Sequence, residues 1–209
     1  MKRLVPLCVL FAAMAPQLAL AYPNPDTMQY NNKFEVGDAA DWQPVGYAQF
    51  VRSMGGSPSS HSGRNFVRLA ARAPGEWASI NHWQDVRAGD ACVYAVWVKT
   101  SAELTNGYIT VRRDGGGGNQ GAIMEERVLA GLRPAGSPAD NGYQLFEIDF
   151  STGNSTRLLF YVGMYGNGKD SWVEVDDVTI LCDPLGPAEA GNSGGSDPNG
   201  MNRRRPQNF

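Results

Sequence analysis

The stretch WASINHWQDVRAGDACVYAVWVKT, residues 77–100, decides the fold class of this chain. Its two ends, Trp77–Val86 and Ala91–Thr100, alternate between apolar and polar residues and are rich in Val, Ile, Tyr and Trp. Between them stands Arg87-Ala-Gly-Asp90, a typical turn sequence. Alternation with a period of two residues places successive side chains on opposite faces of an extended strand. The stretch therefore predicts two β-strands joined by a short turn.

The same pattern continues on both sides of this pair. Strands are predicted, in addition, at Tyr30–Glu35, Val45–Arg52, Phe66–Ala71, Gly107–Arg113, Tyr143–Phe150, Arg157–Met164 and Trp172–Leu181. Gly-rich or Pro-containing turns separate many of them, and Ile123–Leu132 has the composition of a single helical turn. Many short strands without a long amphipathic helix indicate an all-β fold, an antiparallel β-sandwich or jelly roll.

The two ends of the chain differ from this middle part. Lys2 and Arg3 precede an apolar run, and Ala19-Leu-Ala21 is a small-residue cleavage site, so residues 1–21 read as a signal peptide. The apolar run is shorter than the ~20 residues that cross a bilayer. We expect a cleaved, secreted or periplasmic protein without membrane insertion, with a retained membrane anchor as the alternative. Residues 184–209 are rich in Gly, Asn, Ser and Pro and predict a disordered tail after a domain at 22–183.

Charge and cysteine content restrict the partners and the compartment. The formal net charge is -3, and removal of the leader takes away two positive charges. This balance gives no electrostatic reason for binding nucleic acid. As a separate expectation, the protein is a monomer. Cys92 and Cys182 are the cysteines that follow the leader. In an oxidising compartment they predict one disulfide, and two unpaired buried thiols are the alternative.

Five segments carry a family resemblance. Asn31–Gly37 followed by Trp42 resembles the "N-G-x-F-E-x-G…W" motif of one large group of jelly-roll modules. The other four segments, in matching order, are His61–Gly63 before Phe66–Leu69, Gln84–Asp90, Tyr94–Lys99 and Trp172–Ile180. Together they resemble the carbohydrate-binding modules of galactose-binding-like fold that accompany bacterial xylanases and cellulases. The resemblance implies a jelly roll that binds a polysaccharide or glycan without catalysis.

The resemblance also implies a disulfide position and a metal site. Cys92 stands where the family tends to place an aromatic residue, at the start of one strand, and Cys182 ends another. If the two strands are antiparallel neighbours, the sulfurs can meet. Family members often hold a structural calcium ion, and the corresponding ligands here would be Glu35, carbonyls near Gly63, and Asp176 or Asp177. Alternatively, these carboxylates accept backbone hydrogen bonds or pair with arginine.

Candidate ligand-binding residues come from sorting the aromatic side chains. Trp42, Trp97 and Trp172 match family positions that serve the core, so we expect them to pack inside. Trp77 and Trp83 do not match core positions, and a period of two places both on one face of a strand together with Asn81. Residues six apart on a strand are roughly 20 Å apart, which suits the two ends of an oligosaccharide. The alternative is that at least one of the two tryptophans is in the core.

Three more residues are weaker candidates for the same site, namely Tyr108, Arg112 and Tyr165. No motif of a nucleophile, a metal-binding histidine pair or a phosphate loop accompanies His61 or His82. We therefore expect a secreted, non-catalytic glycan-binding protein. An extracellular structural or adhesion protein and a small secreted glycan-active hydrolase are the alternatives.

Overall fold

A computed structural model describes residues 27–35, 38–53, 60–117, 119–129 and 141–184 of the chain. The predicted signal peptide, residues 1–21, and residues 185–209 of the predicted tail lie outside these ranges. Within them, no helix is long and apolar enough to span a bilayer. The one helical element described is a short 3₁₀ turn, Asp38–Asp41.

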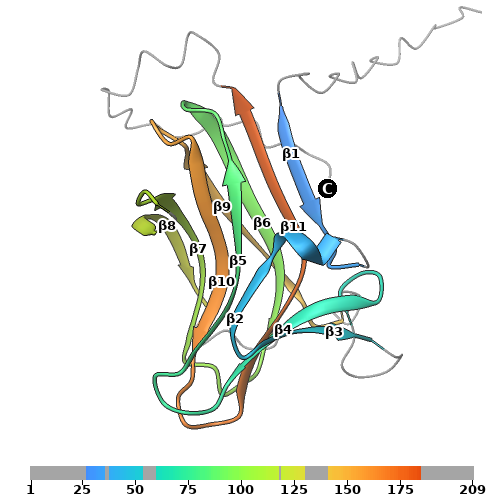
Figure 1. The fold of residues 1–209 in the computed structure, drawn as a ribbon. Helices are drawn as coiled ribbons and strands as arrows, with labels where there is room; N and C mark the ends of the chain where they lie inside the picture. Colours follow the sequence, from blue (N-terminus) through green and yellow to red (C-terminus); the bar gives the residue numbers. More distant parts are fainter. Residues whose placement is uncertain (1–26, 36–37, 54–59, 118, 130–140, 185–209) are drawn as a thin grey trace, which may run out of the picture.

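Two antiparallel sheets pack face to face (Figure 1). The first, called here the β11 sheet, has the order β3-β4-β11-β6-β9, and β1 also pairs with β11. Its strands are β1 (Met28–Asn32), β3 (Ala48–Arg52), β4 (Asn65–Ala71), β6 (Asp90–Thr100), β9 (Gln144–Ser151) and β11 (Ser171–Pro184). The second, the β10 sheet, has the order β2-β5-β10-β7-β8. Its strands are β2 (Gln43–Gly46), β5 (Trp77–Asp85), β7 (Asn106–Asp114), β8 (Gln120–Val128) and β10 (Arg157–Tyr165). The predicted antiparallel β-sandwich is confirmed.

The core lies between the two sheets and follows the alternation of the strands. On β10, Phe160 and Val162 are fully buried, and they meet Tyr94 and Val96 of β6 within one apolar cluster. Trp42 belongs to this cluster, as expected. Burial of such apolar surface stabilises the sandwich at about 25 cal/mol per Å².

The core assignment of two tryptophans is wrong. Trp97 and Trp172 are half-buried on the outer face of the β11 sheet, because their neighbours Val96, Val98 and Val173 take the inward positions of the pleat. Trp97 stacks on the ring of His61, with 3.8 Å between the ring centroids. Trp172 lies under the Arg68 guanidinium at 4.6 Å.

One strand prediction and one helix prediction also need correction. Val45–Arg52 is not one strand, because Gly46 has a φ of +64° and the chain crosses there from the β10 sheet to the β11 sheet. Residues 123–128 are not a helical turn but part of β8, which forms a hairpin with β7 around the Gly-rich turn. This edge strand is mostly exposed, so its residues lack the apolar alternation from which a buried half-strand is predicted.

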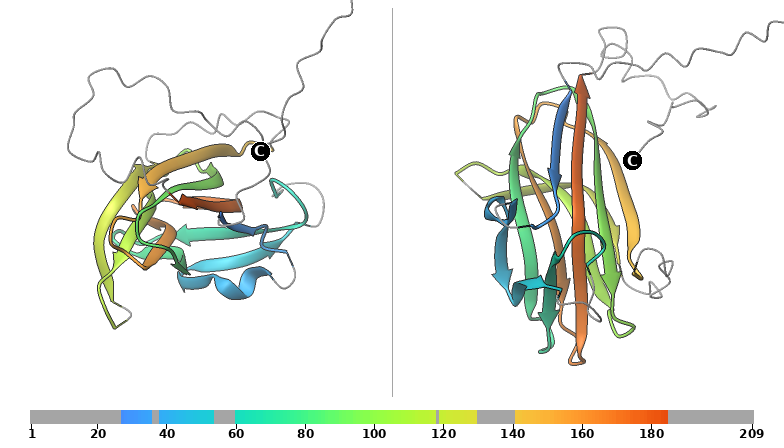
Figure 2. Two further views of the ribbon diagram at one scale, coloured as in Figure 1. Left: turned by 90° about the horizontal axis from the view of Figure 1, so that it is seen from above. Right: turned by 90° about the vertical axis from the view of Figure 1, so that its right-hand side faces the viewer.

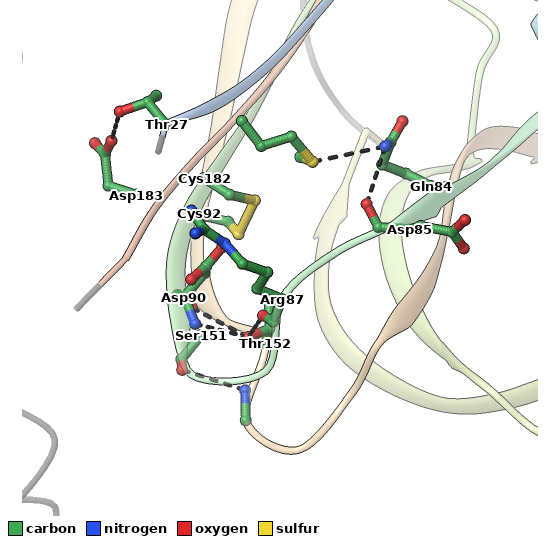
Figure 3. The surroundings of a disulfide bond; sticks show 12 residues. Thr27, Gln84, Asp85, Arg87, Asp90, Cys92, Ser151, Thr152, Cys182 and Asp183 are labelled. Atoms are coloured by element: carbon green, nitrogen blue, oxygen red, sulfur yellow. Dashed lines mark hydrogen bonds and ion pairs between the residues drawn. A yellow bond between two sulfur atoms is a disulfide. The ribbon is translucent and has the colours of Figure 1, made fainter. Parts of the chain in front are cut away.

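The disulfide prediction is confirmed. Strands β6 and β11 pair antiparallel with Cys92 directly opposite Cys182, and the two sulfurs are bonded. Figure 3 shows the turn at this end, where the Thr152 hydroxyl accepts a hydrogen bond from the Asp90 amide at 2.9 Å and donates to the Arg87 carbonyl at 2.7 Å. The bridge therefore joins two central strands beside a hydrogen-bonded turn.

Strand β11 pairs on one side with two different strands in succession. β4 pairs with its first part, from Ser171 to Val175, and β1 with its later part, from Val178 to Cys182. The long strand and its neighbour β1 are visible side by side in the right-hand view of Figure 2. An irregularity between Asp176 and Val178 falls between the two pairings. These two pairings leave Asp176 and Asp177 where β11 has neither β1 nor β4 beside it.

Candidate functional site

A cleft of about 410 Å³ lies on the outer face of the β10 sheet. Its lining comes from β5, β7, β8 and β10, and consists of Trp77, Asn81, Tyr108, Arg112, Gln120, Ile123, Glu126, Tyr161 and Tyr165. Five of the six predicted ligand-binding residues are therefore brought together here, from three different strands. The sixth, Trp83, is not among the lining residues.

Strand register explains why these side chains meet. Tyr165 lies opposite Trp77 of β5, and Tyr161 lies opposite Asn81. On the other side of β10, Gly163 lies opposite Tyr108 of β7. All these residues alternate with the core-facing residues of their strands, so their side chains project from the same outer face.

Four aromatic rings form one connected group in the cleft. The ring centroids of Trp77 and Tyr165 are 4.6 Å apart, and those of Trp77 and Tyr161 are 6.0 Å apart in an edge-to-face arrangement. Tyr108 contacts Tyr165 edge to face at 6.4 Å. Tyr165 is 43% exposed, so its ring is open to a ligand, whereas Trp77 is half-buried. The group provides apolar ring surface that is held in place by aromatic packing.

Hydrogen bonds organise the polar part of the cleft. The Trp77 indole N–H donates to the Ser79 hydroxyl at 3.0 Å, and that hydroxyl donates to Asn81 Oδ1 at 3.0 Å. Arg112 Nη1 donates to Gln120 Oε1 at 2.6 Å.

Tyr161 and Glu126 are the remaining polar contributors. The Thr110 hydroxyl donates to Glu126 Oε2 at 3.2 Å. Burial raises the pKa of Tyr161 above its ordinary value, so its phenol is neutral at physiological pH and keeps its O–H donor.

Trp83 occupies the other end of β5 on the same face as Trp77. It is half-buried and outside the core cluster, and the Arg157 guanidinium lies 5.1 Å from its ring centroid. The alternative that one of the two tryptophans belongs to the core is therefore not what the structure shows. The Arg157 contact occupies ring surface that a sugar would need.

Four residues that line the cleft were not predicted from the sequence, namely Tyr161, Gln120, Ile123 and Glu126. A signal for Tyr161 was present, because it stands four residues before Tyr165 and shares its face by the period of two. The other three belong to β8, which the sequence analysis did not recognise as a strand. Only the β7–β8 hairpin brings their side chains to the cleft.

The predicted metal ligands gather away from the cleft, near the gap between β1 and β4. Glu35 Oε1 accepts hydrogen bonds from the backbone amides of Arg64 and Asn65, at 2.6 and 2.9 Å. Glu35 Oε2 accepts one from the Asn65 side-chain amide at 3.1 Å. Gly63 is close by, since a Cβ added to it would lie 2.2 Å from Glu35 Oε1.

Asp176 and Asp177 both bind the loop that contains His61 and Ser62. Asp176 Oδ2 accepts from the amides of His61 and Ser62, at 2.8 and 3.1 Å, and its Oδ1 accepts from the Asp177 amide at 2.8 Å. Asp177 contacts the His61 ring at 2.5 Å and accepts from the Ser62 hydroxyl at 2.7 Å. Burial, followed by the charge of Asp177, raises the pKa of Asp176 to about 7.

These contacts determine whether the carboxylate oxygens are available as ligands of a cation. N–H donors already point at both oxygens of Glu35 and of Asp176, which favours the hydrogen-bonded alternative over a preformed calcium shell. Among the described residues, no group of three or more His, Cys, Asp or Glu side chains could hold a metal ion. Calcium at this cluster stays a prediction of the family resemblance alone, and the described contacts favour the hydrogen-bonded arrangement.

Comparison with known proteins identifies the fold. No family model matches the sequence, and neither does any curated protein sequence. Among solved structures, the CBM22-1 xylan-binding domain of Paenibacillus barcinonensis Xyn10C matches with a TM-score of 0.51 and 14% identity, over 75% of this chain and 95% of that chain. TmCBM61 in complex with beta-1,4-galactotriose matches with a TM-score of 0.50 and 18% identity, over 72% and 94%.

The same fold also occurs in a protein of another kind. The K1 cleaved adhesin domain of Lys-gingipain from Porphyromonas gingivalis W83 matches with a TM-score of 0.50 and 10% identity, over 76% of this chain and 99% of that chain. At these identities the likeness concerns the fold alone, and a function has to be argued from the site. The chain has the β-sandwich jelly-roll fold that these two carbohydrate-binding modules and this adhesin domain share.

Proposed function

We propose that this protein is a secreted, non-catalytic glycan-binding protein and that its binding site is the cleft of the β10 sheet. One observation carries the proposal: the cleft places a group of aromatic rings, including Trp77 and Tyr165, next to the polar side chains of Asn81 and Arg112. Aromatic faces pack against the C–H faces of sugar rings, while amide and guanidinium groups hydrogen-bond sugar oxygens. Sites for small ligands combine apolar walls with a few fixed polar groups in this way.

The expected strength of binding follows from the small number of aromatic rings that a sugar can contact. An aromatic contact contributes on the order of 1 kcal/mol beyond the area that it buries. One tightly connected ring group with a few hydrogen bonds therefore supports a Kd of about micromolar to millimolar. Such affinity suits a protein that holds a polymer by repeated weak contacts.

The lining of the cleft supports a non-catalytic role. Hydrolysis of a glycosidic bond ordinarily uses two carboxyl groups on either side of the bond, about 5 to 10 Å apart. Among the described lining residues, Glu126 is the only carboxylate, and none is a histidine. The two histidines of the chain are engaged elsewhere, His61 with Asp177 and His82 between the rings of Tyr30 and Trp42.

Secretion is supported by two independent features. Residues 1–21 have the composition of a cleavable leader, with Ala19 and Ala21 at the predicted cleavage site. A disulfide such as Cys92–Cys182 forms and persists in oxidising compartments outside the cytoplasm.

A glycan array probed with the secreted protein tests the proposal. Wild type should bind at least one class of oligosaccharide, and Trp77→Ala should lose that binding. Trp83→Ala is the matched control, because it removes the same ring from the same strand outside the cleft. Absence of binding by the folded wild type would reject the glycan proposal and leave the adhesion protein as the alternative.

A further inference from the structure

The hydrogen bonds of the cleft determine which atoms of Asn81 are offered to a ligand. An indole N–H can only donate, so Ser79 Oγ is the acceptor of the Trp77 bond. Ser79 is fully buried, and its single hydroxyl proton therefore needs an acceptor inside the protein. Asn81 Oδ1, at 3.0 Å, is that acceptor. The carbonyl oxygen of Asn81 is thus engaged, and its NH₂ group with two N–H donors is left for the cleft.

The other amide of the cleft, Gln120, is oriented in the same way by its neighbour. A guanidinium has donors and no acceptor, so the bond from Arg112 Nη1 must end on Gln120 Oε1, at 2.6 Å. The NH₂ group of Gln120 is then its free end. Arg112 Nε is a buried donor that has no hydrogen-bond partner among the described residues. Three side chains of the lining, Asn81 on β5, Arg112 on β7 and Gln120 on β8, therefore present N–H donors.

The charges of the cleft favour a negatively charged acceptor for these donors. Arg112 is half-buried, and hydrogen bonds from a cation to an ionised oxygen are roughly twice as strong as neutral ones. The one opposing charge in the described lining is Glu126, which accepts a hydrogen bond from Thr110 and is exposed. Water and salt screen an exposed charge more than a partly buried one. The attraction by Arg112 therefore outweighs the repulsion by Glu126.

We propose that the glycan taken by this cleft carries carboxylates, so that its sugars include uronic acids. The inference rests on the proposed glycan-binding function and narrows it to one substrate class. The aromatic group would contact the sugar rings, while Asn81, Arg112 and Gln120 donate to the carboxylate oxygens. Neither a metal ion nor a covalent step is involved.

Matched pairs of oligosaccharides test this class without changing the sugar backbone. One pair is hexagalacturonate with its fully methyl-esterified form, and a second is hexaglucuronate with its carboxyl-reduced form. By calorimetry, the acid of at least one pair should bind tenfold or more tightly than its neutral partner at low salt. The difference should shrink in 0.5 M sodium chloride, as expected for a charge-dependent contact (about 3–10 Å Debye length between 1 M and 0.1 M).

Three variants assign the preference to particular atoms. Arg112→Gln should remove the preference for the acid, whereas Glu126→Gln, the charge change of opposite sign in the same cleft, should increase it. Asn81→Asp keeps the size of the side chain and the acceptor for Ser79 but replaces the NH₂ donor by oxygen. It should therefore abolish acid binding while its melting temperature stays near that of wild type.

The outcomes separate this inference from the proposed function. Equal or tighter binding of the neutral partner would overturn the uronic-acid inference and leave glycan binding in place. No binding by either member of both pairs, with neutral glycans bound on the array, would overturn it in the same way. If the folded protein binds no glycan at all, the proposed function fails as well.

Discussion

The indole ring of Trp77 lies against the backbone of Gly163 on the neighbouring strand, so closely that a Cβ added to Gly163 would lie 2.3 Å from Trp77 Cη2. No side chain larger than hydrogen fits there unless the ring moves. The ring position in turn determines the contacts with Tyr161 and Tyr165. A glycine, which has no side chain, therefore shapes the aromatic surface of the cleft.

Gly163→Ala should weaken glycan binding at least tenfold, because the new methyl group displaces the Trp77 ring. The ring is half-buried and can move outward, so the cost in stability should stay within the about 1–3 kcal/mol of an overpacked site. Calorimetry and thermal unfolding measure the two effects. Adding Gly163→Ala to Trp77→Ala should change binding no further, since residues in contact are not additive. An additive loss would show that Gly163 acts independently of the ring.

Three tryptophan variants should give three different results. Trp77→Ala should abolish detectable glycan binding, and Trp83→Ala should leave most of it, because only Trp77 lines the cleft. Trp42→Ala removes a fully packed core ring and should lower the free energy of unfolding by about 3–5 kcal/mol. Denaturant unfolding and affinity measurements on the same samples separate these outcomes. Loss of binding in Trp83→Ala alone would move the site to the other end of β5.

Calcium removal tests the carboxylate cluster. The hydrogen bonds on Glu35 and Asp176 lead us to expect the same melting temperature in excess chelator and in millimolar calcium. A ligand that binds only the native state would raise stability by about 2.7 kcal/mol at a concentration 100 times its Kd. A calcium-dependent rise in melting temperature, lost in Glu35→Gln, would therefore establish the calcium site that the family resemblance implies.

The buried carboxyl group of Asp176 should make stability depend on pH. Its pKa is raised from 3.8 to about 7, so the folded state binds the proton more tightly than the unfolded state. Its contribution to stability is complete below the unfolded pKa and is lost as the pH rises through the folded pKa. The free energy of unfolding of wild type should therefore fall, relative to Asp176→Asn, between about pH 4 and pH 8.

The difference between the two proteins is the quantity to measure, because carboxyl groups distant from Asp176 contribute equally to both. Asp149→Asn, an exposed change on β9, is the matched control and should leave the pH dependence unchanged. A constant difference between wild type and Asp176→Asn across this range would show that Asp176 is ionised in the folded protein throughout.

Reduction of the disulfide should destabilise the sandwich without changing the cleft. The chain-entropy model gives about 4.5 kcal/mol for a closed loop of this length, with a sequence separation of 90. A variant with Cys92→Ala and Cys182→Ala should unfold at lower denaturant but bind glycan with unchanged affinity while folded, because both cysteines belong to the other sheet. Denaturation curves with and without reductant provide the control, since reductant should affect only wild type.

Periodicity predicted most of the fold, because buried strands must alternate. Trp77–Val86 and Ala91–Thr100 were expected as strands and correspond to β5 and β6. The same rule failed for β8, whose residues are exposed on an edge and carry no apolar alternation. It also failed at Gly46, where a single residue with positive φ turns the chain into the other sheet.

The part of the candidate site that lies on a single strand could be predicted, because alternation determines which side chains of that strand share a face. Trp77 and Asn81 share a face by simple alternation, and the structure places both in the cleft. Their meeting with Tyr161 and Glu126 depends on the register between strands far apart in sequence, which local pattern does not contain. The position of Trp97 and Trp172 on the outer face depends in the same way on which side of their strands meets the second sheet.

The disulfide also determines how the domain responds to mechanical tension. Cys182 stands two residues before Pro184, the last residue of β11, and is bonded to the neighbouring strand. A pull on the chain beyond Pro184 reaches this covalent bond before most of the backbone ladder between β11 and β6. The tension therefore passes from β11 into β6, and β11 does not peel away from β6 one hydrogen bond at a time. A polymer held on the opposite sheet would stay attached under a drag that would otherwise unzip the strand.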